Sequence, residues 1–314
     1  MLDSVWHGCY VRHMTDTTLP ERTRENVADR LLGGSVKRSY APVVDIDWDA
    51  PIDPDRYFLP PHMCTLYGTD LWEQMTEEQR IELSKQEVTN LLSMGIWFEN
   101  LLNRLLLREL LSADPTSRDS FYSLTEMGDE CRHMVMFGKV IDRIGTRPFR
   151  LRGWQLGVVK YVLAPVIRGQ AVWIAALVGE EIFDAQQRQI KDDPELQPIV
   201  ARLMQIHVTE EARHIGYARD GARRGMPTRS RAQTLLVGNL HALAAFGFRM
   251  LFANPRMYAR VGLDPKVAYR AAVTNPHHLK AKQDGFRDLG RFLESVGLMG
   301  PIARWSWKRA GFLA

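Results

Sequence analysis

Asp129-Glu130-Cys131-Arg132-His133 and Glu210-Glu211-Ala212-Arg213-His214 are two copies of one pattern: an acid, a Glu, a variable residue, an Arg and a His. Positions three apart lie about 60° apart around an α-helix, so the Glu and the His of each copy point the same way. Carboxylate and imidazole groups on one helix face are a common start for a metal site.

A single Glu precedes each copy by the same distance. Glu99 lies 31 residues before Glu130, and Glu180 lies 31 residues before Glu211. On helices this spacing predicts two hairpins, each with a Glu on one helix and a Glu-x-x-His on the next. Four such helices enclose four carboxylates and two histidines, a cage for a pair of metal ions. The sequence therefore predicts an all-α protein with a four-helix bundle core and additional C-terminal helices.

Two further positions bear on the ligand set. His207 lies one turn before Glu211, within about 40° of it, so the fourth helix offers three ligands on one stripe. A lone His on a helix is more often a hydrogen-bonded core residue, and its place on the ligand face favours a metal role. Glu181 competes with Glu180, because it continues an apolar row from Ile174, whereas the equal offset favours Glu180.

The donor types indicate which metal fits. Carboxylate oxygen with imidazole nitrogen suits iron or manganese, and the absence of thiolate ligands argues against a structural zinc. Four carboxylates neutralise two divalent ions, which limits the cost of burying the cluster. We expect Asp129 and Glu210 to accept ligand histidine N–H groups, and Arg132 and Arg213 to pair with these acids. Solvated charges on amphipathic helices are the alternative, and the matching Arg, acid and offsets argue against it.

Bulk properties exclude several classes. The 314 residues are 45% hydrophobic, and a net charge of +4 without a long basic block argues against nucleic-acid binding. Three cysteines form no C-x-x-C pair, which fits a reducing cytoplasm. The most apolar stretch, 234–255, is interrupted by Asn239, His241 and Arg249, and this favours a buried helix over an integral membrane segment.

The chain divides into an arm and a helical domain. Residues 1–60 are rich in Pro and Asp and predict an extended N-terminal arm, and residues 61–314 predict a single helical domain. A Trp- and Arg-rich tail follows the last helix and is expected to pack on the body. The alternative is that it enters a membrane interface or covers a partner. Six helices are expected. The first begins at a capping box of Thr76 and Gln79 and ends at Leu111, and the second carries Glu130 and His133 and ends before Gly145. The third covers about 169–191, the fourth has Pro194 in its first turn and ends near Gly225, and the last two lie near 229–253 and 277–297.

These motifs resemble a known family. The paired Glu…Asp/Glu-Glu-x-Arg-His pattern resembles that of the di-iron carboxylate oxygenases of the ferritin-like superfamily. With the extra histidine of His207-Val208-Thr209-Glu210-Glu211-Ala212-Arg213-His214, roughly residues 70–225 resemble the p-aminobenzoate N-oxygenase family, whose di-iron site has seven protein ligands. The resemblance implies as ligands Glu99, Glu130, His133, Glu180, His207, Glu211 and His214.

The resemblance also implies an activity. Two Fe ions would bind O2 as co-substrate and form a peroxo-diferric species. This species oxidises an aromatic amine through the hydroxylamine toward the nitro compound. An external electron donor, a reductase or ferredoxin, is implied, since no flavin- or nicotinamide-binding motif is present. A homodimer is expected for this class. The substrate, the oxidation depth and a Mn/Fe variant of the centre stay open.

Side chains near the expected metals have two interpretations. Gly95, one turn before Glu99, is expected to leave space beside the metal. Leu92, Leu102 and Leu106 line an apolar pocket there or simply belong to the core.

Other functions remain as alternatives. A soluble fatty-acyl desaturase or a carbon hydroxylase shares the paired pattern but lacks the extra ligand histidine. A ferritin-type iron-storage protein needs short cage-forming subunits, which 314 residues fit poorly. A non-catalytic helical adaptor is disfavoured because every expected ligand type is intact.

Overall fold

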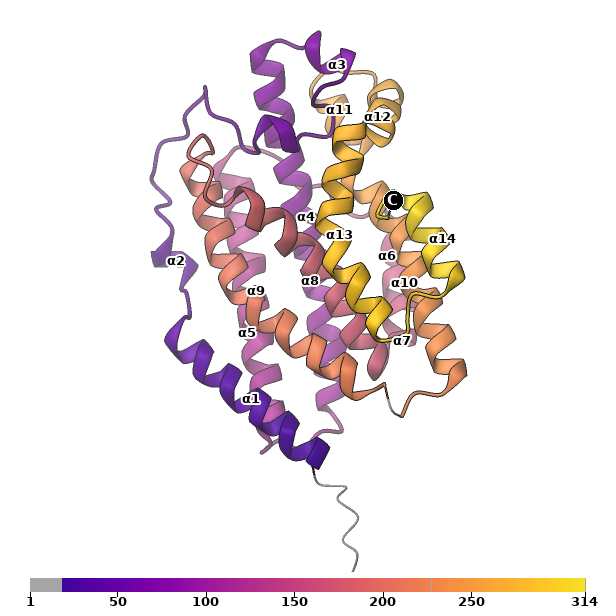
Figure 1. Ribbon diagram of the computed structural model, residues 1–314. Coiled ribbons are helices and arrows are strands. Elements are labelled where there is room, and N and C mark those ends of the chain that lie inside the picture. Colours follow the sequence, from indigo (N-terminus) through magenta and orange to yellow (C-terminus); the bar gives the residue numbers. More distant parts are fainter. Residues whose placement is uncertain (1–18, 227, 314) are drawn as a thin grey trace, which may run out of the picture.

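The computed structural model describes residues 19–226 and 228–313. Within these ranges the chain is all-α, as predicted, and its one pairing of strand type is an isolated parallel bridge between Tyr57 and Leu196. Four long helices form the centre (Figure 1): α4 (Glu77–Leu110), α5 (Arg118–Arg143), α8 (Gln170–Ile190) and α9 (Pro198–Arg224).

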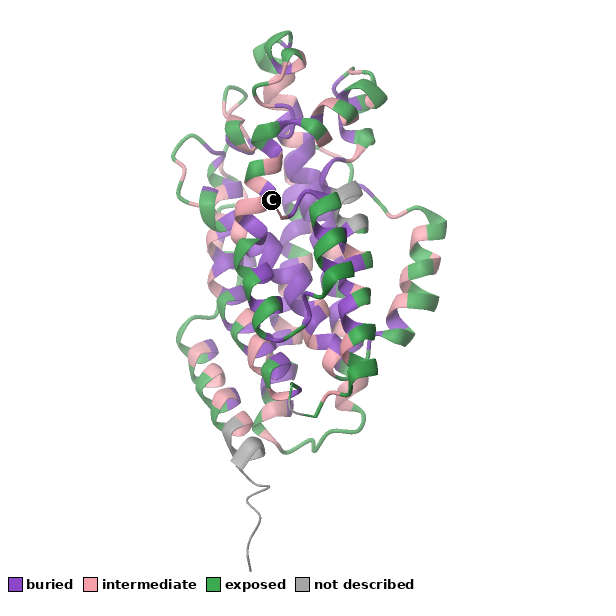
Figure 2. Cartoon of the chain, turned by 45° about the vertical axis from the view of Figure 1, so that its right-hand side comes forward, coloured by how far each residue is buried: buried purple, intermediate pink, exposed green. Residues whose placement is uncertain are grey.

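The four helices pack as two hairpins. α4 lies against α5 and α8 against α9, and the hairpins meet through α4 with α8 and α5 with α9. Buried residues concentrate along the axis between them, and exposed residues lie on the outside of the molecule (Figure 2). The predicted four-helix core is therefore present, and its interior carries charged residues of both motif copies.

Local sequence explains where these helices begin. The capping box is formed, with the Thr76 side chain accepting from the Gln79 backbone and the Gln79 side chain accepting from Thr76. At the N-terminus of α5, the Ser117 side chain accepts from the Ser120 backbone N–H. The expected role of Pro194 is wrong: it lies in the preceding turn, and Pro198 occupies the first turn of α9.

The N-terminal region differs from the prediction. Residues 1–18 of the expected arm lie outside the described residues, and Leu19–Lys37 form a helix, α1, instead of extended chain. Ala28 is fully buried and Leu31 and Leu32 are half-buried, a helical spacing of apolar residues that packs α1 across α5 and α9. The short α2 (Pro42–Asp45), η1 (Pro61–Met63) and α3 (Asp70–Glu73) follow.

More C-terminal helices are present than the two expected. They are α10 (Arg231–Phe252), α11 (Pro255–Arg260), α12 (Pro265–Thr274), α13 (Pro276–Ser295) and α14 (Pro301–Ala310). Each of α11 to α14 has proline in its first turn, a position that proline favours. The tail is helix α14, in which Trp307 is buried and Trp305 is 60% exposed.

The connection between the hairpins is helical as well. It comprises α6 (Gly153–Val158), η2 (Val159–Leu163) and α7 (Ala164–Val166). Over the described residues, none of the helices combines the length and the apolar character that crossing a bilayer requires. The apolar stretch near 234–255 forms most of α10 and packs against α8, α4 and α14.

Candidate metal centre

The seven side chains expected as ligands meet inside the bundle. Each is at most 4% exposed. Their donor atoms form two groups, within each of which one donor per residue lies within 4.8 Å of the others. One group holds Glu99, His133 and His207, and the other holds Glu130, Glu180, Glu211 and His214.

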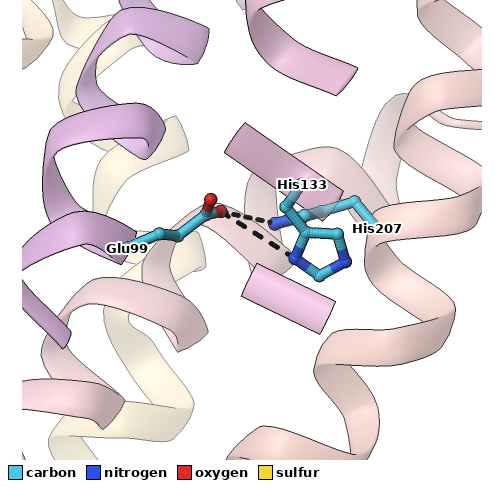
Figure 3. Close-up of side chains that lie close together, drawn as sticks. All are labelled: Glu99, His133 and His207. Atoms are coloured by element: carbon cyan, nitrogen blue, oxygen red, sulfur yellow. Dashed lines mark hydrogen bonds and ion pairs between the residues drawn. The ribbon is translucent and has the colours of Figure 1, made fainter. Parts of the chain in front are cut away.

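The first group joins three helices. Glu99 extends from α4 toward the two histidines (Figure 3). Its Oε1 lies 3.4 Å from His207 Nε2 and 3.9 Å from His133 Nδ1. One carboxylate and two imidazoles therefore face a common point.

The second group is linked to the first by two glutamates. Glu130 approaches His214 Nδ1 with Oε1, at 2.9 Å, and His133 Nδ1 with Oε2, at 3.2 Å. Glu211 Oε1 lies 3.3 Å from His214 Nδ1 and 3.4 Å from His207 Nε2. Each of these carboxylates thus reaches histidines of both groups.

Many of these donor atoms have no hydrogen-bond partner among the described residues, although buried polar groups are normally paired. Their close approaches are geometrically poor hydrogen bonds, because the atoms face a shared centre instead of one another. Such a set of unpaired oxygen and nitrogen donors fits a pair of metal ions. The unpaired atoms are Glu99 Oε2, Glu130 Oε1, both oxygens of Glu180, both oxygens of Glu211 and His214 Nδ1.

Each motif's acid holds the histidine of the other motif. Glu210 on α9 lies 2.9 Å from His133 Nε2, and Asp129 on α5 lies 3.2 Å from His214 Nε2. In both cases the outer ring nitrogen donates to the carboxylate, which leaves Nδ1 facing the centre. Sequence reasoning anticipated that these acids serve the histidines, but not that the pairing crosses between helices.

The arginines of the two motifs complete this network. Arg213 donates to Asp129 at 3.1 Å and lies 3.8 Å from Glu210, so one guanidinium steadies both acids. Arg132 pairs with Asp129. Burial acts to raise the pKa of Asp129, but His214 and then these two arginines outweigh it and lower the pKa.

His207 has a different outer partner. Its Nδ1 lies 2.8 Å from Gln187 Oε1, which leaves Nε2 toward the centre. Gln187 was missed from the sequence, although it follows Glu180 by seven residues, two helical turns along the same face of α8. An amide partner supplies no charge, and burial together with nearby His133 lowers the pKa of His207.

The carboxylates are difficult to ionise together in this dry interior. Burial raises the pKa of Glu99 and of Glu180 well above the usual range, and neighbouring carboxylates add to the effect. For Glu130, burial also acts to raise the pKa, but His214 and His133 outweigh it and lower the pKa. The cluster needs added positive charge, which two divalent cations would supply for four carboxylates.

Position 180 faces the group and position 181 faces away. Glu181 accepts from Arg219 through both carboxylate oxygens, one of them at 3.1 Å from Nε. Glu180 has no such partner and is 3% exposed. The two neighbouring carboxylates therefore have different environments, one paired with a guanidinium and one directed into the group.

The space beside the group is small. A cavity of about 10 Å³ is lined by Leu92, Gly95 and Phe137 together with ligand-type residues, room for about one water. Gly95 borders this space as expected, although the Phe137 ring fills the part of it that a Cβ would occupy, since a Cβ there would meet Phe137 Cε2 at 2.6 Å. Leu102 and Leu106 pack in the core and do not line this cavity.

A fifth buried carboxyl adjoins the centre. Glu126 on α5 lies one turn before Glu130, and neither of its oxygens has a hydrogen-bond partner among the described residues. Burial and then nearby Glu130 and Glu211 raise the pKa of Glu126 to about 8, against the effect of His214. The signal for it in the sequence was the i, i+4 spacing of two glutamates on one face.

A helical bundle with buried Glu and Glu-x-x-His ligands on paired helices is the arrangement of ferritin-like di-metal carboxylate proteins. The fold and the site thus define this class. The chain matches the model of the family P-aminobenzoate N-oxygenase AurF over residues 21–297, and it belongs to that family.

Relatives are similar over most of their length. The uncharacterized proteins Rv0885 of Mycobacterium tuberculosis and Mb0909 of Mycobacterium bovis are each 30% identical over 286 residues, which cover 88% of this chain and 83% of theirs. Among solved structures, a mutant R2-like ligand-binding oxidase with an aerobically reconstituted Mn/Fe cofactor aligns over 98% of this chain and 96% of its own. Its sequence identity is 16% and its TM-score is 0.43.

Proposed function

We propose that the chain is a di-iron monooxygenase that N-oxygenates an aryl amine, from the amine toward the hydroxylamine and nitro levels. The observation that carries this proposal is the convergence of seven buried donors in two groups, with most of their inward-facing atoms unpaired. Family membership supports the reaction type. When bound, the two irons supply the redox chemistry that activates dioxygen and transfers oxygen to the substrate.

The proposed ligand roles follow the contacts of each side chain. Glu99, His133 and His207 would hold one iron. Glu180 and His214 would hold the other. Glu130 and Glu211 reach histidines of both groups and would contribute ligand atoms to either ion. Manganese in place of one iron is compatible with the same donors.

The surrounding residues orient the ligands and exclude water. Asp129, Glu210 and Gln187 each fix one histidine, so that its inward nitrogen is kept as an acceptor for the metal. Leu91, Phe98 and other apolar side chains border the small cavity beside the group. A dry site of this kind limits hydrolysis of reactive species. An aryl ring needs these side chains to move, because the cavity itself holds about one water-sized molecule.

Two partners belong to the same proposal. An external electron donor, a reductase or ferredoxin, would supply reducing equivalents. A homodimer is proposed from the class, since such enzymes commonly pair through a flat helical face.

The test is oxidation of p-aminobenzoate by iron-loaded protein. Protein loaded anaerobically with ferrous iron is mixed with oxygenated buffer in a stopped-flow instrument, with and without the amine. We expect a transient visible absorption band that decays faster with the amine, and hydroxylamine or nitro products by mass spectrometry. A band that decays at the same rate with and without the amine would reject the amine substrate and leave only the oxygen-activating function.

The nearest alternative is a di-iron fatty-acyl desaturase or carbon hydroxylase. These enzymes share the paired motif but lack the third histidine, so the variant His207→Ala discriminates between the two functions. The variant should lose iron-dependent amine oxidation if His207 is a seventh ligand, and a variant that oxidises amines normally would reject that role. A storage protein would elute from a sizing column as a large cage, and an adaptor would bind no iron.

A further inference from the structure

A second cavity lies beside the metal centre. It has a volume of about 110 Å³ and is formed by α4, α8, α10 and the chain around α7. These elements lie side by side on the flank of the bundle that carries the C-terminal helices (Figure 1). Its walls include Leu101, Ile174, Val178 and Val237, and His241 is the one lining residue with a polar side chain besides Trp97.

His241 offers no hydrogen bond to an occupant. Its Nε2 donates to the Leu298 carbonyl at 2.9 Å, and its Nδ1 accepts from Trp307 Nε1 at 3.2 Å. Burial lowers the pKa of His241, so the ring is neutral and its two nitrogens are both engaged. An occupant that needs hydrogen bonds would lose those it makes to water. This cavity therefore favours a small apolar molecule.

One aromatic ring separates this cavity from the metal-side cavity. Phe98 lines both of them, and it directly precedes Glu99 on α4. The ring lies against Gly179, where a Cβ would sit 1.6 Å from Phe98 Cζ. Gly179 directly precedes Glu180 on α8. The partition thus lies where two of the helices present carboxylates to the centre.

The cavity is lined by half-buried as well as buried residues. Its lining residues Trp97, Ala175 and Ala244 are half-buried, whereas Phe98 and Val178 are buried. A molecule that enters at the half-buried rim meets apolar walls until it reaches the Phe98 ring.

We propose that this cavity admits dioxygen and holds it beside the centre, and that dioxygen passes to the metals along the edge of the Phe98 ring. This inference rests on the proposed oxygen-activating function. Dioxygen is small, uncharged and weakly hydrated, which matches walls that are apolar apart from the half-buried Trp97 indole and the fully hydrogen-bonded His241. Engineered apolar cavities of about 150 Å³ stay dry and bind xenon or benzene, so this somewhat smaller cavity suits a diatomic gas.

Xenon tests the binding site without any metal. Crystals of metal-free protein are pressurised with xenon, and anomalous difference maps are calculated. We expect a xenon peak among Ile174, Val178 and Val237. The variants Ala175→Phe and Ala244→Phe fill the rim from α8 and from α10, and both should lose the xenon peak. Two variants are used so that the test still stands if one of them fails to fold. Ala232→Phe, exposed on α10 and outside the cavity lining, is the matched control and should keep it.

Kinetics tests the passage. We expect the reduced, iron-loaded rim variants to react with dioxygen about tenfold more slowly, with the KM for the amine and the iron content unchanged. Absence of xenon from the wild type would overturn the proposal, as would a dioxygen rate that is unchanged after the peak is lost. A higher KM for the amine at an unchanged dioxygen rate would assign the cavity to substrate and overturn the proposal. If the protein binds no iron, both the proposed function and the dioxygen role of the cavity are rejected. If the wild type binds no xenon but oxidises the amine normally, only the role of the cavity is rejected.

Discussion

Replacing Glu180 with glutamine should remove one metal ion without harming the fold. Both Glu180 oxygens lack hydrogen-bond partners, and burial, with Glu211 and other nearby carboxylates, raises its pKa. A neutral amide therefore removes an unfavourable buried acid, so we expect metal-free E180Q to be at least as stable as the wild type. Metal binding at 100 times Kd stabilises a fold by about 2.7 kcal/mol, and a hundredfold weaker site would lose about 2 kcal/mol of this.

The neighbouring variant E181Q is the matched control. Glu181 pairs with Arg219, whose side chain is 30% exposed. Losing that charge-assisted pair should cost about 1–2 kcal/mol, with the partial exposure limiting the effect. The loss should be the same with and without iron, and E181Q should keep both metal ions. The two variants thus separate a ligand from a structural carboxylate one position away.

The assay combines metal analysis with guanidinium unfolding of metal-free and iron-loaded protein. We expect about one iron per chain and a reduced iron-dependent stabilisation for E180Q only. If E180Q retained two irons while E181Q lost one, the assignment of position 180 would be refuted. If both variants retained two irons, neither glutamate would be a ligand.

Three other predictions follow from single contacts. Gln187→Leu should weaken iron binding about 10- to 100-fold by releasing His207, measured by titration with a chelator, and unchanged binding would reject the orienting role. Burial raises the pKa of Glu87 to about 7. The contribution of Glu87 to the free energy of unfolding is therefore complete below the ordinary glutamate pKa and is lost as the pH rises through 7. Glu87→Gln should therefore recover about 3 kcal/mol of unfolding free energy at pH ~8 and little at pH ~4, and a pH-independent difference would contradict this. Gly179→Ala should destabilise by about 1–3 kcal/mol because its Cβ displaces the adjoining ring, whereas Gly138→Ala, with open space around it, should stabilise the helix by about 0.5–1 kcal/mol in the same thermal unfolding assay.

Local spacing was sufficient to predict the motif helices. Glu130 and His133 must share a face at three residues apart on any α-helix, and the equal offsets placed Glu99 and Glu180 opposite the motifs. The Thr76 capping box likewise gave the start of α4, because capping depends on neighbours in sequence.

Contacts between helices were beyond that reasoning. The cross-pairing of Asp129 with His214 and of Glu210 with His133 depends on the rotation of α5 against α9, which spacing within one helix does not determine. Gln187 belongs to no sequence motif, and its role in orienting His207 is evident only from the contact between the two side chains. The arm was misjudged because its Pro and Asp content outweighed the helical spacing of apolar residues in α1.

The central claim is that these seven residues form a dinuclear iron centre. Anomalous diffraction at the iron absorption edge, from crystals of iron-loaded protein, tests it most directly. We predict two peaks inside the bundle, one within ligand distance of Glu99, His133 and His207, and one within ligand distance of Glu180 and His214, with Glu130 and Glu211 near both. A single peak, no peak, or peaks away from these side chains would contradict the claim.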